Sequence, residues 1–151
     1  MRLRLIVVGL ALAGACRAPS VSAPEPVRLK VDKLQERVVR DAGADLTAAG
    51  FQVTSSDRQR GQLTAQLSGR TFDLRPFIKC AAHDEDALFR LGTTTLTVTV
   101  NAQPDGSRSE VVVAARATTK AFQGGSHAIN DDTTCVSSGA IEARVARALQ
   151  M

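Results

Sequence analysis

The strongest constraint on the fold is a strictly alternating segment in the second half of the chain. Threonines alternate there with the apolar residues Leu96, Val98 and Val100. Successive side chains of a strand point to opposite faces, so this pattern predicts a strand that is buried on one face. The tight-turn residues at positions 104–106 and a second alternating segment, roughly 110–122, complete a predicted β-hairpin. Its solvated face is expected to carry a row of threonines: Thr93, Thr95, Thr97 and Thr99.

Two amphipathic helices are predicted on either side of the strands. In the first, apolar residues recur at spacings of three and four over about five turns, and Gly50 suits its C-terminal cap. Its stripe comprises Val31, Leu34, Val38, Ala42, Leu46 and Ala49. Ser137 or Ser138 can cap the second helix, which has Glu142 in its first turn. Its buried stripe comprises Ile141, Val145 and Leu149.

A shorter hairpin is predicted between the first helix and the threonine-rich strand. Residues 51–54 and 63–67 alternate on either side of the polar turn SSDRQRG. The stretch 71–91 gives no clear pattern. The order helix, four strands, helix therefore predicts an α+β domain over residues 27–151. We expect two helices packed on one face of a four-stranded antiparallel sheet, in a helix-grip-like arrangement.

The N-terminal residues have the layout of a bacterial secretory signal. Arg2 and Arg4 precede an apolar run, and small residues lead to Cys16. A cysteine in this place is typical of a lipoprotein signal, in which the cysteine is lipidated and becomes the new N-terminus. Ala13 stands where such signals usually have leucine, and ordinary cleavage after Ala15 is the alternative. Residues 1–15 are thus predicted to be a signal peptide.

Residues 16–26 then form the anchor cysteine and a tether rich in proline, serine and alanine. At about 3.1 Å per residue, ten such residues reach roughly 30 Å from a membrane surface. In well-studied enterobacteria an aspartate after the anchor cysteine retains lipoproteins at the inner membrane. Arg17 stands there instead, so we expect the periplasmic face of the outer membrane, or the free periplasm if Cys16 carries no lipid.

The composition of the mature chain argues against nucleic-acid binding. Removing residues 1–15 from 151 leaves 136, enough for one small domain. Arg2 and Arg4 leave with the signal, so 17 basic residues face 15 acidic ones and the net charge is +2. The chain has no tryptophan and no tyrosine, which excludes most aromatic stacking platforms.

The remaining cysteines form an even pair. In an exported protein, Cys80 and Cys135 are expected to form a disulfide. The alternative is a tetrahedral Cys2His2 metal site, in which His83 and His127 join the two cysteines.

One segment carries a family resemblance. Gly50-Phe51-Gln52-Val53, followed by the Ser56-Asp57-Arg58 turn that runs through Gly61 into a strand, resembles the helix-grip domains of BamC-type lipoproteins. The resemblance covers roughly residues 31–67. Proteins of that family are accessory subunits of the outer-membrane β-barrel assembly machinery.

We therefore expect a lipid-anchored periplasmic binding or scaffold domain without catalytic residues or a cofactor. Its expected contacts are the membrane, through the N-terminal lipid, and a protein of an envelope complex. The alternative is a periplasmic domain that binds a metal or a small ligand.

Overall fold

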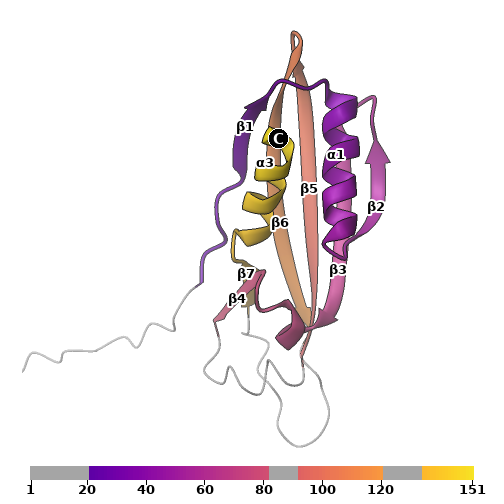
Figure 1. Ribbon diagram of the computed structural model, residues 1–151. Helices are drawn as coiled ribbons and strands as arrows, with labels where there is room; N and C mark the ends of the chain where they lie inside the picture. The colour runs from indigo at the N-terminus through magenta and orange to yellow at the C-terminus, as the bar shows by residue number, and fades with distance from the viewer. Residues whose placement is uncertain (1–20, 82–91, 121–133) are drawn as a thin grey trace, which may run out of the picture.

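Five antiparallel strands form the main sheet of the computed structural model, which describes residues 21–81, 92–120 and 134–151 (Figure 1). The long central hairpin consists of β5 (Thr93–Asp105) and β6 (Arg108–Lys120). β3 (Gln62–Arg70) and β2 (Gln52–Asp57) extend the sheet beyond β5, and β1 (Val27–Val31) pairs with β6. The strand order across the sheet is β1-β6-β5-β3-β2.

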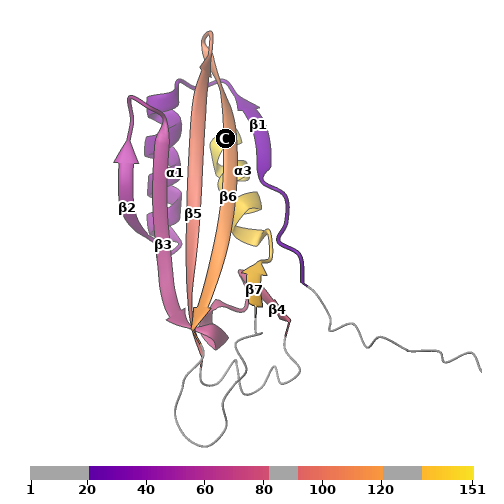
Figure 2. The same ribbon diagram turned by 180° about the vertical axis from the view of Figure 1, so that it is seen from behind.

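Two α-helices, α1 (Gln35–Ala48) and α3 (Ala140–Gln150), lie on the same face of this sheet (Figures 1 and 2). The core fills the space between the helices and the sheet, because the alternating strand residues point toward the helical stripes. The helices contribute Val38, Val39, Ala42, Leu46, Ile141, Val145 and Leu149, all nearly inaccessible to solvent. The sheet contributes Leu63, Ala65, Leu96, Val98, Val100, Ala102, Val111 and Val113.

A second, two-stranded sheet closes one end of the domain. After the short 3-10 helix η1 (Thr71–Leu74), β4 (Ile78–Ala81) pairs with β7 (Thr134–Ser137). Both strands lie at the end opposite the β5–β6 turn (Figure 1). The chain also enters the domain at this end, since a Cβ at Gly139 would lie 3.8 Å from Pro24.

The predicted fold class is wrong. The main sheet has five strands and not four, and a second sheet of two strands accompanies it. The described order is β1, α1, β2, β3, η1, β4, β5, β6, β7, α3, so a strand precedes the first helix. The added elements are short, and β4 lies in the stretch that gives no readable pattern.

The start of the first helix also differs from the prediction. Val31, assigned to the helical stripe, is the last residue of β1 and pairs with Ser109. Leu34, assigned to the same stripe, precedes the first helical residue and its residue surface is 63% exposed. Apolar residues alternate with basic ones over residues 27–31, which is a strand signal. Val31 also fits the spacing of the helix that follows, so the predicted helix includes the end of this strand.

The predicted serine cap of the second helix is wrong, because neither Ser137 nor Ser138 occupies the N-cap position. Gly139, in a left-handed conformation, occupies the N-cap position, and its N–H donates to Ser137 Oγ at 3.1 Å. Ser137 Oγ in turn donates to Glu142 Oε2 at 2.8 Å, so this buried carboxylate joins β7 to α3.

The threonine row lies on the sheet face away from the helices, as predicted. Thr93 and Thr99 are exposed and Thr95 and Thr97 are partly exposed. Figure 2 views this face, which neither helix covers.

Candidate functional site

The two structural cysteines are joined at the end of the domain where the chain enters. Cys80 on β4 and Cys135 on β7 are direct partners in the strand register, with their sulfurs 2.05 Å apart and their Cα atoms 4.0 Å apart. The disulfide pairing predicted from the sequence is therefore present. It closes a loop with a sequence separation of 55 residues and ties β4 to β7, the strand that leads into α3.

The disulfide leaves no free thiolate on either cysteine for the alternative Cys2His2 site. His83 and His127, its other two members, lie outside the described residues. Within residues 21–81, 92–120 and 134–151, no group of three or more His, Cys, Asp or Glu side chains could hold a metal ion. The predicted lipidation site, Cys16, also lies outside the described residues.

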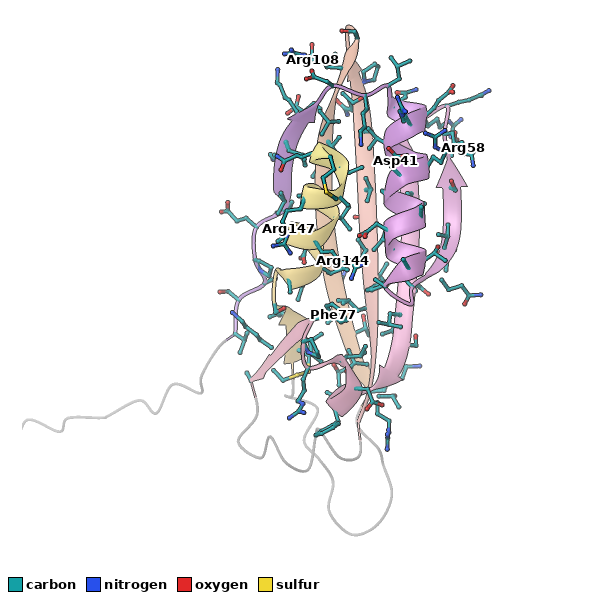
Figure 3. The ribbon with its side chains drawn as sticks, in the orientation of Figure 1. Asp41, Arg58, Phe77, Arg108, Arg144 and Arg147 are labelled. Atoms are coloured by element: carbon teal, nitrogen blue, oxygen red, sulfur yellow. A yellow bond between two sulfur atoms is a disulfide. The ribbon has the colours of Figure 1, made fainter. Side chains whose placement is uncertain are left out.

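A pocket of about 350 Å³ opens at the other end of the domain. Leu34, Glu36, Arg37 and Arg40 line it from the start of α1, and Arg58 lines it from the turn between β2 and β3. We call this the arginine pocket. Figure 3 shows Arg58 beside α1 at the end of β2.

The lengths of α1 and β2 explain why these residues meet. The 14 residues of α1 span about 21 Å at 1.5 Å per residue. The six residues of β2 span about 20 Å and run back in the opposite direction. Because the two lengths match, the turn after β2 returns to the level at which the helix begins. Helical spacing of three residues places Leu34, Arg37 and Arg40 on one side of that helix.

Local hydrogen bonds fix the shape of the turn that carries Arg58. The Arg60 N–H donates to Asp57 Oδ1 at 2.9 Å, and the Ala102 N–H donates to the Gly61 carbonyl at 2.8 Å. Gly61 has a φ of +68°, and a Cβ there would lie 2.0 Å from the Ala102 carbonyl oxygen. The Gln35 side chain also donates to the Gln59 carbonyl and connects the helix to the turn. The position of Arg58 is therefore set by its neighbours.

The arginine pocket is electropositive, with three guanidinium groups and one carboxylate. Among the described residues, Arg37 and Arg58 form no ion pair. Arg40 Nε lies 3.3 Å from Asp41 Oδ1, and Lys33 Nζ lies 3.2 Å from Asp41 Oδ2. Burial raises the pKa of Asp41, but hydrogen bonds and charge from Lys33 and Arg40 outweigh it and hold the pKa below its usual value.

The open sheet face, which neither helix covers, is a second exposed surface (Figure 2). On β3 and β5 its side chains are mainly threonine and glutamine, and it also carries charged residues, including Arg70 on β3 and Arg116 and Lys120 on β6. Ser68 and Thr95 hydroxyls hydrogen-bond across it at 2.8 Å. Side chains of this kind satisfy one another and water, so the face alone indicates no particular ligand.

The sequence reasoning missed the arginine pocket. Arg37 and Arg40 fall within the predicted first helix and Arg58 within the predicted polar turn, and no pattern in the sequence connects them. The lengths of the helix and the following strand match only with the observed bounds, because the predicted helix of about five turns is much longer than the predicted strand 51–54.

Comparisons with known proteins identify no family for this chain. No family model matches it, and no curated protein is detectably similar. Solved structures with a related chain trace include a DUF4468 family protein from Bacteroides ovatus. That protein is 12% identical, with a TM-score of 0.35 over 87% of this chain and 83% of its own. We base no conclusion on a likeness of this size. Neither described helix is long and apolar enough to cross a membrane.

Proposed function

We propose that this chain is an exported domain, anchored by a lipid at Cys16, that binds a protein partner in the cell envelope. It acts as a non-enzymatic accessory or scaffold subunit. The observation that carries this proposal is the Cys80–Cys135 disulfide. Disulfides persist in oxidising compartments and are rare where thiols are kept reduced.

The place of the disulfide supports a tethered domain. It braces the same end at which residues 21–26 join the fold, where Pro24 lies against Gly139. A domain held by one end on a tether presents its other end and its faces to partners. In this chain, the other end carries the arginine pocket.

The chemistry of the pocket supports binding rather than catalysis. Its lining offers guanidinium groups, one glutamate and one apolar side chain. A hydrolytic or transfer reaction needs a nucleophile or base oriented by a second group, and this lining supplies no such pair. Arginines that line a pocket are suited to holding an anionic group in place.

The resemblance to BamC-type accessory lipoproteins suggests an envelope complex as the setting. The segment that carries it, residues 31–67, includes α1, β2 and the turn that together line the arginine pocket.

Affinity purification from solubilised cell envelopes tests this proposal. The chain, tagged after Met151, is expected to recover the same envelope proteins in repeated purifications after chemical crosslinking. The Cys16→Ala variant is the matched control, because it keeps the domain and is expected to move to the soluble periplasmic fraction. Recovery of no specific envelope protein by the anchored chain would contradict an accessory role.

A further inference from the structure

The arginine pocket combines two kinds of side chain that suit one kind of ligand. Arg37, Arg40 and Arg58 supply planar guanidinium groups, which match the two oxygens of a carboxylate. Leu34 lies beside them with 63% of its residue surface exposed, so its side chain is open to a ligand. A ligand that offers both carboxylates and an apolar group would use the whole lining.

The balance of charge limits how anionic the ligand can be. Glu36 belongs to the same lining, so the net charge of the pocket is +2. Asp41 already engages one of the three guanidinium groups, that of Arg40. A densely charged phosphate cluster would meet the repulsion of Glu36, whereas two or three separated carboxylates could avoid it.

The position of the pocket favours a protein as its ligand over the membrane to which the domain is anchored. The tether joins the domain at the disulfide end, and α1 begins at the opposite end of the long sheet (Figure 1). From Thr93, at the disulfide end of β5, to Ala102, which hydrogen-bonds to Gly61, the strand advances nine residues, or roughly 31 Å. When the tether holds the domain upright, the pocket faces away from the lipid surface.

We propose that the arginine pocket binds a carboxylate-bearing peptide segment of a partner protein, with an apolar side chain of that segment against Leu34. This inference rests on the proposed function, because it names the chemistry by which the domain would recognise its partner. Arg37 and Arg58 would contact the carboxylates directly, since neither forms an ion pair with another described residue.

Fluorescence anisotropy with a set of short labelled peptides tests the proposal on the purified, oxidised domain. Each peptide carries a leucine between aspartates or glutamates. At low salt, wild type is expected to bind at least some of them, and binding should weaken as salt is added. The double variant Arg37→Gln/Arg58→Gln is expected to bind about tenfold more weakly or worse, because two charge-assisted contacts are lost.

The matched control is the double variant Arg116→Gln/Lys120→Gln. It removes the same charge from exposed positions on the open sheet face and should leave peptide affinity within about twofold of wild type. Circular dichroism checks that both variants are folded, which is expected for exposed substitutions. Equal loss of affinity in the two double variants would mean that only net charge matters, and would overturn the proposal.

Leu34→Ser separates the apolar contact from the charges. Serine at this N-cap position can accept a hydrogen bond from the first helical turn, so the variant should be at least as stable as wild type. Its peptide affinity should nevertheless fall about threefold to tenfold, because a buried apolar contact is lost. If the variant is at least as stable as wild type but binds the peptides with unchanged affinity, Leu34 is not part of the binding site.

Two further probes decide between ligand sources. Inorganic phosphate and vesicles of phosphatidylglycerol are tested as competitors of the peptides and as ligands on their own. Vesicle binding that requires Arg37 and Arg58, with no acidic peptide bound at millimolar concentration, would overturn the proposal in favour of a lipid surface. If no probe binds but envelope proteins are still recovered, the pocket assignment fails while the proposed accessory role stands.

Discussion

Arg144 on α3 holds Asp45 on α1 through two nitrogen atoms. Its Nε lies 3.1 Å from Oδ2 and its Nη2 lies 3.1 Å from Oδ1. The hydrogen bond with Asp45 and the charge of that carboxylate raise the pKa of Arg144. This bidentate pair joins the two helices above the core. The Asp45 side chain in it is only 19% exposed.

A double-mutant cycle measures the strength of this link. Asp45→Asn and Arg144→Gln should each lower the free energy of unfolding, with a coupling of about 0.5–1 kcal/mol, since the partly exposed arginine is screened by water. Urea unfolding gives the four values. Arg147→Gln, an exposed change on the same helix, is the control and should have almost no effect. A coupling of zero would show that the pair is only incidental.

Gly61 should be far less replaceable than the other turn glycine, Gly106. Both have positive φ, +68° and +64°, so an alanine costs about 1–2 kcal/mol at either site. At Gly61 a Cβ would also meet the Ala102 carbonyl oxygen, whereas at Gly106 it meets open space. We therefore expect Gly61→Ala to lower the thermal midpoint by several degrees more than Gly106→Ala. Equal midpoints would contradict the close approach of this turn to β5.

Loss of the disulfide should destabilise the domain strongly. With a loop of 55 residues between Cys80 and Cys135, the chain-entropy relation gives about 4 kcal/mol. The variant Cys80→Ser/Cys135→Ser, or reduction of the wild type, should shift the urea midpoint accordingly. Native protein should contain no zinc, and after denaturation without reductant it should show no free thiol from this pair. Two free thiols with bound zinc would restore the alternative metal site.

The ion pairs of Asp41 should make stability depend on pH. Lys33 and Arg40 hold the Asp41 pKa below its ordinary value of 3.8 in the folded state, despite the opposing effect of burial. The contribution is therefore fully present above the unfolded-state pKa and is lost as pH falls through the lower folded-state pKa. Compared with Asp41→Asn, wild type should be more stable near pH 7, and the difference should shrink as acid is added. A difference that grows in acid would contradict this sign.

The sequence predicts elements well where the hydrophobic period is long and regular. The β5–β6 hairpin and the stripe of α3 follow from their alternation and their spacing of three and four. Short elements are harder to detect. β1 has five residues that run into the helical pattern, so Val31 fits a stripe of period 3.6 as well as a strand of period two.

The site depends on tertiary geometry that a linear pattern does not contain. Nothing local in the sequence relates Arg58 to Arg37, which lie 21 positions apart. They meet because β2 returns along α1 and Gly61 lets the turn approach β5. The cysteines were easier to pair, because setting Cys16 aside leaves only Cys80 and Cys135, which can pair in one way.

We have proposed that the domain is exported and held at a membrane through Cys16. Intact mass spectrometry of the protein purified from the membrane fraction tests this proposal. The expected mass is that of a chain that begins at Cys16, carries a lipid, and contains the Cys80–Cys135 disulfide. A soluble cytoplasmic chain that retains residues 1–15 and has reduced cysteines would contradict it.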